Sequence, residues 1–243
     1  MQHPDFRYSE SRNIYSGKLA RELEGRVYSD NSSEAHRGTW RTRFPDAAKE
    51  SEASPGKGIL ERRALHVEVG CNAGHVVVEW AARDPKVAYI GLDWKFKPVF
   101  RAAEKAKKRG VENLLFLRAH AERLPFMFAE EEIDHLYLYF PDPWAKKSQL
   151  KNRFITATNF RRLHPLIRPG GIFHIKTDHA GYFEWMVKAL EETSGLWEVQ
   201  SLTRDLHEGN LDAAKLTMPE VTLFERLFIK DGLPIHSLLL KRI

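Results

Sequence analysis

Cysteine is nearly absent from this sequence, since Cys71 is the single one among 243 residues. One cysteine excludes an internal disulfide and gives no sign of an oxidising compartment. The 11 histidines show no metal-binding spacing, either with Cys71 or among themselves. We therefore expect no metal site.

Long apolar runs are lacking too. The first thirty residues hold no apolar core of signal-peptide length, and no later run approaches the ~20 residues of a membrane span. We expect a soluble, cytoplasmic protein with no membrane partner. No internal repeat is visible, and a hydrophobic content of 42% is ample for one large or two small domains.

Positive charge is in modest excess, with a formal net charge of +5 and a pI near 9.2. It is concentrated in residues 95–109 and 140–170, each with seven basic residues against one acid, a local charge of +6. A basic helix is usually only a solvated face. Two such stretches, one of them beginning beside Asp142, favour a polyanionic partner such as RNA.

Residues 1–58 are polar and short of aliphatic side chains. We interpret them as a basic N-terminal extension, partly disordered, in front of a domain that spans residues 59–243. Within the extension, residues 37–44 read RGTWRTRF, in which arginines alternate with aromatic residues. Such a segment can grip a nucleic acid, or it can pack Trp40 and Phe44 onto the domain. The sequence leaves both interpretations open.

From Ala64 onward, strand and helix patterns alternate, which is typical of a doubly wound, mostly parallel α/β sheet of the Rossmann-like kind. A helix is expected from 154 to 167, ending at Pro169-Gly170-Gly171. The expected strands are 65–69, 87–92, 114–117, 133–140 and 172–176, with an antiparallel edge pair at 197–202 and 236–240.

The first strand breaks at Gly70 and Gly74, where glycine permits a tight turn and lets a ligand approach the backbone. Asp93 ends the second strand, a usual place for a carboxylate that accepts from two ribose hydroxyls. Glu68 lies inside the first strand, and a buried carboxylate is costly unless it is paired, so we place it near a ligand.

The spacing of Gly70 and Gly74 differs from the G-x-G-x-x-G of nicotinamide proteins. It resembles the E-x-G-x-G-x-G loop of S-adenosylmethionine-dependent methyltransferases, with Asn72 at the middle glycine.

A motif at residues 140–147 reads FPDPWAKK and follows the apolar strand 133–140. Prolines on both sides of Asp142 restrict its freedom, and it lies at the carboxyl end of a strand, where open α/β sheets bind ligands. A rigid acid beside Trp144 and a lysine pair suits a cationic or hydrogen-donating aromatic ring attached to phosphate. A plain turn is an equally ordinary role for Pro-Asp-Pro.

Further motifs add to this one: PGG at 169–171, KTD at 176–178, TLFERLF at 222–228 and GLPI at 232–235. Together they resemble the tRNA (guanine-N7)-methyltransferase family, over about Arg37 to the C-terminus. The resemblance implies a class I S-adenosylmethionine-dependent methyltransferase fold with a seven-stranded sheet and an antiparallel edge hairpin. It also implies methylation of a tRNA variable-loop guanine at N7, with tRNA as partner, by a monomer or homodimer.

The same resemblance assigns roles to individual residues. Asp142 would be catalytic. The cofactor S-adenosylmethionine would be held by Glu68, Gly70, Gly74, Asp93, His120 and Asp142, and the substrate by Lys146, Asp178, Thr222 and Glu225. Three positions depart from the family pattern, namely Asn72 for glycine, His120 for the acid or amide that meets adenine, and Ala145 for proline.

The chemistry agrees with this assignment. Guanine N7 carries a lone pair and no proton, so methyl transfer to it needs alignment and no strong general base. A carboxylate such as Asp142 can stabilise the positive charge that develops on the purine and can accept from its N–H donors. The alternatives are a non-catalytic RNA-binding protein of the same fold and a nicotinamide-dependent oxidoreductase. The mass of a bound cofactor would separate the oxidoreductase from the methyltransferase.

Overall fold

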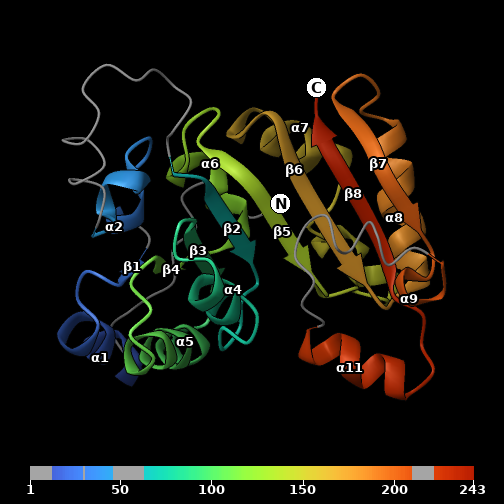
Figure 1. The fold of residues 1–243 in the computed structure, drawn as a ribbon. Helices are drawn as coiled ribbons and strands as arrows, with labels where there is room; N and C mark the ends of the chain where they lie inside the picture. The colour runs from blue at the N-terminus through green and yellow to red at the C-terminus, as the bar shows by residue number, and fades with distance from the viewer. Residues whose placement is uncertain (1–12, 30, 46–62, 210–221) are drawn as a thin grey trace.

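The computed structural model describes residues 13–29, 31–45, 63–209 and 222–243. Its centre is one eight-stranded sheet with the order β1-β4-β3-β2-β5-β6-β8-β7 (Figure 1). The strands are β1 (Val27–Ser29), β2 (Leu65–Val69), β3 (Ala88–Asp93), β4 (Leu114–Arg118), β5 (Ile133–Tyr139), β6 (Ile167–Thr177), β7 (Trp197–Thr203) and β8 (His236–Arg242). Strands β1 to β6 pair in parallel, and β8 is antiparallel to both β6 and β7.

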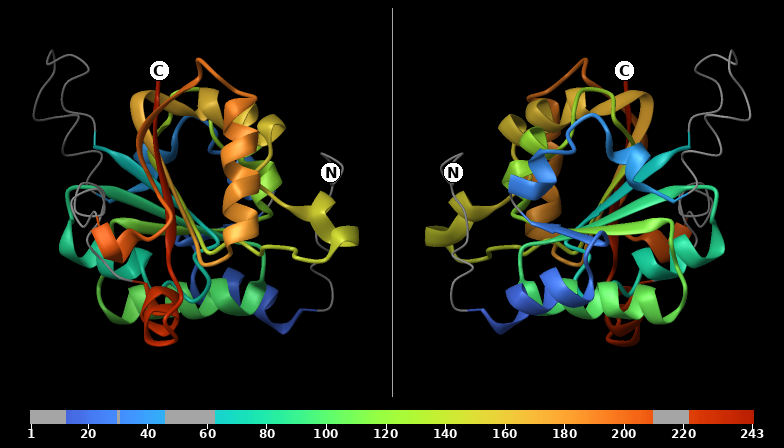
Figure 2. Two further views of the ribbon diagram at one scale, coloured as in Figure 1. Left: turned by 90° about the vertical axis from the view of Figure 1, so that its right-hand side faces the viewer. Right: turned by 90° about the vertical axis from the view of Figure 1, so that its left-hand side faces the viewer.

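The helices form a layer on each face of the sheet (Figure 2). One apolar cluster packs α1, α4 and α5 against the sheet, and a second packs η1, α6, α7 and α8 against the other face. The bounds are α1 (Ile14–Glu22), α2 (Asn31–Glu34), η1 (Trp40–Arg43), α4 (Val77–Arg83), α5 (Phe96–Lys108), η3 (Ala121–Arg123), α6 (Leu124–Met127), η4 (Lys147–Asn152), α7 (Ala157–Leu163), η5 (His164–Leu166), α8 (Ala180–Glu191), α9 (Leu206–Gly209) and α11 (Leu223–Lys230).

The strand order reverses between β2 and β5, which are neighbours although β3 and β4 separate them in the chain. Ligands of open α/β sheets bind beyond the carboxyl ends of the strands at such a point. In Figure 1, the arrowheads of β2, β5 and β6 point toward the side of the molecule where α11 lies. Each strand-tip residue singled out above therefore belongs to this edge of the sheet.

The expected doubly wound α/β fold is confirmed, with one strand more than the seven expected. Strand β1 comes from the N-terminal extension and pairs with β4, with Val27 opposite Phe116. The helix expected to reach residue 167 also ends earlier, because α7 stops at Leu163 and β6 begins at Ile167. Pro169-Gly170-Gly171 therefore lies inside β6. A Cβ on Gly171 would lie 2.7 Å from the Asp134 carbonyl oxygen, so that part of the strand requires glycine.

The RGTWRTRF segment packs onto the domain, which decides between the two interpretations of its aromatic residues. Trp40 and Phe44 are buried, and Trp40 Nε1 donates to the Met127 carbonyl oxygen at 2.8 Å. The Glu132 carboxylate accepts from the backbone N–H groups of Gly38 and Trp40, at 2.8 and 3.0 Å. The described part of the extension thus belongs to the core. The expected boundary at residue 58 lies outside the described residues.

Candidate active site

The loop after β2 is shaped by three residues with positive φ, at 79° for Gly70, 48° for Asn72 and 64° for Gly74. A Cβ on Gly70 would meet nothing within 4 Å, so the backbone there is open to a ligand. A Cβ on Gly74 would lie 2.9 Å from the Ala102 Cβ of α5. Gly70 is therefore suited to contact a cofactor. Gly74 instead allows the loop to pack closely on α5. Its expected contact with a cofactor stays a prediction.

Glu68 is buried, and its Oε2 accepts from the Val77 N–H at the start of α4, at 3.2 Å. Burial raises the pKa of Glu68 to about 8, against the hydrogen bond from Val77, which lowers it. The carboxyl group is therefore largely protonated at neutral pH unless a cationic ligand group lies beside it. The described contact of the Glu68 carboxyl group is with the start of α4, and its contact with a ligand stays a prediction.

Asp93 ends β3 and fixes the loop after β2. Its Oδ2 accepts from the Asn72 N–H at 3.1 Å and its Oδ1 from the Lys95 N–H at 2.9 Å. Burial raises the pKa of Asp93, and these two backbone N–H groups partly oppose the rise. Each carboxylate oxygen keeps a lone pair, so both can still accept from neighbouring hydroxyls of a ribose.

These groups fit S-adenosylmethionine better than a dinucleotide. Glu68 and Asp93 are acceptors for ammonium and hydroxyl donors, whereas a pyrophosphate would need donors or cations in the loop. Lys105 on α5 donates its Nζ to the Ala73 carbonyl oxygen of this loop at 2.8 Å. The donor and acceptor pattern of the described loop therefore matches a cofactor with an amino acid moiety.

His120 follows β4 and caps η3, with its Nδ1 accepting from the Glu122 N–H at 3.3 Å. Burial lowers the pKa of His120, and the charge of Glu122 opposes this shift. Because Nδ1 accepts, we infer that the neutral ring carries its proton on Nε2. His120 would then donate to an adenine ring nitrogen, where an acid would accept from the exocyclic amine.

The FPDPW turn leaves the sheet after β5 with Asp142 exposed to solvent. Phe140 and Trp144 have φ values of 52° and 43°, a left-handed conformation that is unusual for large side chains. The turn is fixed at both ends: Phe140 N–H donates to the Lys176 carbonyl oxygen at 2.8 Å, and Arg153 Nε donates to the Pro143 carbonyl oxygen at 2.9 Å. Strained backbone of this kind occurs at functional sites.

Lys146 and Asp178 lie at the same edge as Asp142. Tyr139 is in register with Lys176 across β5 and β6, and Asp142 and Asp178 follow the ends of these neighbouring strands by three residues and one residue. Asp178 is half-buried, and Lys146 is exposed just before η4. Both therefore lie at the carboxyl edge of the sheet beside Asp142, and their contact with a substrate stays a prediction.

Thr222 and Glu225 are engaged with each other and with Lys176. The Thr222 Oγ1 accepts from the Glu225 N–H at 3.0 Å, and Glu225 Oε2 accepts from the Thr222 N–H at 2.7 Å. This is a capping box at the start of α11. Glu225 Oε1 also accepts from Lys176 Nζ at 2.8 Å, and all three side chains are buried. Their role as substrate ligands stays a prediction, and the described contacts give them a part in docking α11.

The sequence alone does not indicate the contacts that Lys176 and Arg153 make. Lys176 was read only as part of the KTD motif, and Arg153 only as one of many positive charges. The T-x-x-E spacing did contain a signal, because it is the sequence signature of a capping box. The sequence does not indicate that the capping residue Glu225 also pairs with Lys176 on β6.

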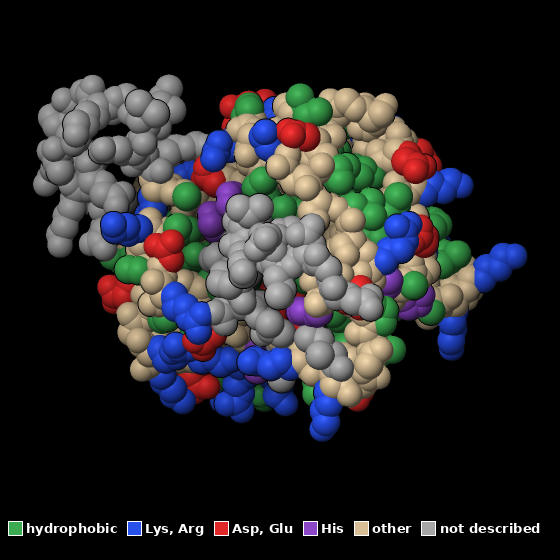
Figure 3. Space-filling model, turned by 45° about the vertical axis from the view of Figure 1, so that its right-hand side comes forward, with side chains coloured by type: hydrophobic (Ala, Val, Ile, Leu, Met, Phe, Trp, Pro, Cys, Tyr) green, Lys and Arg blue, Asp and Glu red, His purple; other side chains and the backbone are tan. Residues whose placement is uncertain are grey.

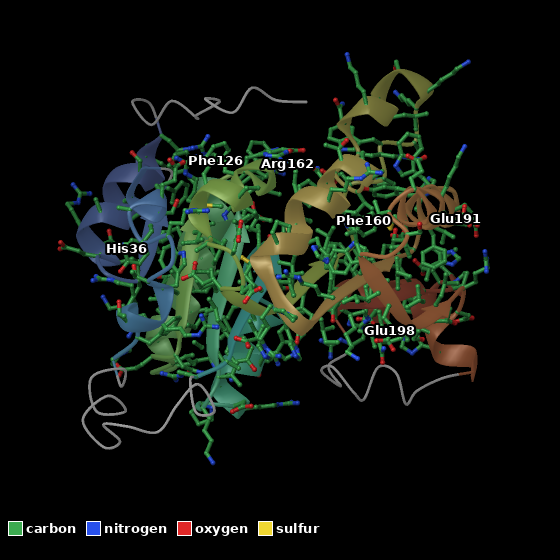
Figure 4. The ribbon with its side chains drawn as sticks, turned by 90° about the horizontal axis from the view of Figure 1, so that it is seen from above. His36, Phe126, Phe160, Arg162, Glu191 and Glu198 are labelled. Carbon is green, nitrogen blue, oxygen red and sulfur yellow. The ribbon has the colours of Figure 1, made fainter. Side chains whose placement is uncertain are left out.

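Part of the positive charge counted from the sequence is paired with acids of the described residues. In α5, Arg109 pairs with Glu79, Arg101 and Lys108 pair with Glu104, and Lys107 donates to a carbonyl. In the second stretch, Arg162 pairs with Glu122 and Arg168 with Asp134 (Arg162 is labelled in Figure 4). In this second stretch, the exposed side chains without an ion pair to a described residue are Lys146, Lys147, Lys151 and Arg161, and Arg161 Nη2 donates to the Glu192 carbonyl oxygen. Figure 3 shows Lys and Arg side chains gathered along one rim of the surface.

Among the described residues, no group of three or more His, Cys, Asp or Glu is placed to hold a metal ion. Nor does any described helix combine the length and apolar character that crossing a membrane requires.

The sequence model of a family described as putative methyltransferase matches residues 62–238. A tRNA (guanine-N(7)-)-methyltransferase of Bdellovibrio bacteriovorus is 31% identical over 208 residues, 86% of this chain and 91% of that protein. The enzyme of the same name from Bacillus subtilis is 31% identical over 172 residues, 71% and 78% of the two chains. Among solved structures, the 16S rRNA methyltransferase KamB shares the fold with a TM-score of 0.54 at 21% identity, over 82% and 94% of the chains.

Proposed function

Because the chain belongs to the tRNA (guanine-N7-)-methyltransferase family, we propose that it methylates N7 of guanine 46 in the variable loop of tRNA, using S-adenosylmethionine. One observation carries the proposal. The cofactor-type loop after β2 and the FPDPW turn after β5 leave neighbouring strands at the point where the strand order reverses. A methyl donor and an acceptor base bound at the two loops would therefore lie next to each other.

The cofactor supplies an electrophilic methyl group on a sulfonium sulfur. Asp93 would accept from the two ribose hydroxyls, while the Asn72 and Lys95 N–H groups hold the carboxylate in place. Glu68 would accept from the ammonium group, which would bring its raised pKa down again. His120 would donate its Nε2 proton to the adenine, and Gly70 leaves its backbone open.

Asp142 is the group that we assign to catalysis. Guanine N7 needs no deprotonation, so the turn has to align the base and stabilise the positive charge that develops on it. The Asp142 carboxylate can do both, because it accepts from the N–H donors of guanine and carries the opposite charge. Lys146 would contact phosphate, and Asp178 supplies a second acid at the next strand.

The test is incubation of the purified protein with labelled S-adenosylmethionine and bulk tRNA, followed by nucleoside analysis. We expect labelled 7-methylguanosine from the wild type. Asp142→Ala should fold and bind both partners but react ~10²–10³-fold more slowly in single turnover, as when a positioned charge-stabilising group is lost. Asp142→Asn should recover only part of the rate. Glu130→Ala removes another exposed acid, near the amino end of β5, and serves as the control.

The outcomes separate the alternatives. If the protein binds tRNA but no methylated nucleoside forms, it is a non-catalytic RNA-binding protein of the same fold. A dinucleotide found by mass in the purified protein would point to an oxidoreductase. A folded Asp142→Ala protein with the wild-type rate would remove Asp142 from catalysis and direct attention to Asp178.

A further inference from the structure

Arg153 lies directly after η4 and is buried, with 7% of its surface exposed. Its guanidinium carbon is 4.8 Å from the ring centroid of Tyr182 and 5.1 Å from that of Trp185, both on α8. Its Nε donates to the Pro143 carbonyl oxygen at 2.9 Å. The side chain thus connects the FPDPW turn to helix α8.

The contact region is itself fixed to α8 by two further hydrogen bonds. The Ile155 N–H donates to the Tyr182 hydroxyl at 3.0 Å, and Trp185 Nε1 donates to the Ile155 carbonyl oxygen at 2.8 Å. Tyr182 and Trp185 therefore pack against the Arg153 guanidinium and also hold the backbone of Ile155, two residues further along the chain. Arg153 stands on a rigid support, whereas η4 before it is exposed.

Asp142, in contrast, receives no hydrogen bond from any residue that the structure describes. The backbone of the turn therefore sets the position and direction of its Cα–Cβ bond. That backbone is held by Phe140 on one side, through β6, and by Pro143 on the other, through Arg153. We propose that Arg153 is a positioning residue of the reaction, which aims Asp142 by fixing the Pro143 carbonyl to α8. This inference rests on the proposed function.

The geometry distinguishes this role from phosphate binding. A cation that contacts RNA must reach solvent, but the Arg153 guanidinium lies against two aromatic rings and its Nε is used inside the protein. Neighbouring Lys151 has the same charge and is exposed. The flat guanidinium stacks on rings and donates from a fixed fork, which a lysine ammonium cannot reproduce.

The experiment compares Arg153→Met with Lys151→Met in the full-length protein, because both lose one positive charge. Arg153→Met should lower the single-turnover rate of methyl transfer to tRNA by ~10–10²-fold, the effect of a misplaced reacting group. Its tRNA affinity, the salt dependence of binding and its cofactor affinity should stay at wild-type values. Lys151→Met is the comparison for a lost phosphate contact, and it should weaken tRNA binding and reduce the salt slope by about 1.

A double-mutant cycle adds a readout that a merely structural role would not give. In an Asp142→Ala background, Arg153→Met should cause no further loss of rate, since there is no carboxylate left to aim. If Arg153→Met does not fold, Arg153→Lys keeps the charge and should still be slower than wild type, because the ammonium cannot stack between the rings.

The inference is overturned if Arg153→Met, or a folded Arg153→Lys, reacts at the wild-type rate. It is also overturned if Arg153→Met loses tRNA affinity and salt slope as Lys151→Met does, or if its effect on rate is undiminished without Asp142. A wild-type protein that makes no 7-methylguanosine would instead refute the proposed function itself.

Discussion

The buried pair of Lys176 and Glu225 makes a quantitative prediction about how α11 is held at the substrate edge. Their side chains are 2% and 1% exposed, and Nζ and Oε1 are 2.8 Å apart. Lys176→Met would leave the Glu225 carboxylate buried without its cation. Removing one partner of a buried ion pair costs ~3–5 kcal/mol, which is a large part of the stability of a typical domain.

The protein has a less costly alternative, which limits this loss. Helix α11 has eight residues, too few to be stable as an isolated helix. Its further described attachments are the His207 ring, whose Nε2 lies 3.6 Å from Glu225 Oε1, and the packing of Phe140 on Phe224 and Phe228, with centroids 5.9 and 5.5 Å apart, where each aromatic pair contributes ~0.5–1.5 kcal/mol beyond its buried area. The expected result is therefore that α11 detaches and hydrates the free carboxylate, while the sheet stays folded.

Hydrogen exchange of residues 222–230 measures this detachment, and urea unfolding measures the rest. Lys176→Met should lose most protection in α11, with a smaller fall in the free energy of global unfolding. The double variant Lys176→Met/Glu225→Gln removes both charges but keeps the acceptor for the Thr222 N–H, so it should regain protection. The reasoning is refuted if residues 222–230 exchange as slowly in Lys176→Met as in wild type. It is also refuted if the double variant shows no more protection of these residues than Lys176→Met does.

Three further predictions follow from individual side chains. Replacing Lys146 and Lys147 together with Ala should weaken tRNA binding and lower its salt slope by about 2 while sparing cofactor binding; equal loss of both affinities would contradict it. His120→Asp should keep the cap of η3 and preserve or tighten S-adenosylmethionine binding, and calorimetry showing abolished binding would refute this. Burial lowers the pKa of His66 to about 3 and of His135 to about 4, so the stability that these neutral rings contribute is complete above pH ~6.5 and is lost as the pH falls below it. Urea unfolding from pH 7 to 4.5 should therefore depend less steeply on pH in His135→Gln than in wild type, and equal slopes would contradict this.

The sequence predicted the parts of the fold that depend on local patterns. Runs such as 65–69 and 114–117 became strands because a doubly wound sheet buries both faces and needs continuous apolar segments. The carboxylates Glu68, Asp93 and Asp142 were found because an acid at the end of an apolar run interrupts the pattern. The candidate site was therefore visible wherever its residues break a local rule.

Features that depend on distant partners were not predictable in this way. Strand β1 has three residues in a polar stretch, and only its pairing with β4 makes it a strand. Pro169-Gly170-Gly171 reads as a helix stop, but contact with Asp134 places it inside β6. Arg153 reads as a surface charge until α8 supplies its two aromatic rings.

The same limit applies to charge, and it changes what the basic composition implies. Arg162 and its partner Glu122 are 40 residues apart, and Arg168 and Asp134 are 34 apart, because ion pairs in this fold join different βα units. A local net charge summed along the sequence counts such cations as free to bind phosphate, although acids of other elements already neutralise them. Of the seven basic residues between 140 and 170, the exposed ones without an ion pair to a described residue are the three lysines around η4 and Arg161, whose Nη2 donates to the Glu192 carbonyl oxygen. Each phosphate contact contributes about 1 to the salt slope of binding. That stretch should therefore contribute about 4 and not 7, and three of these four cations follow Asp142 within ten residues along the chain.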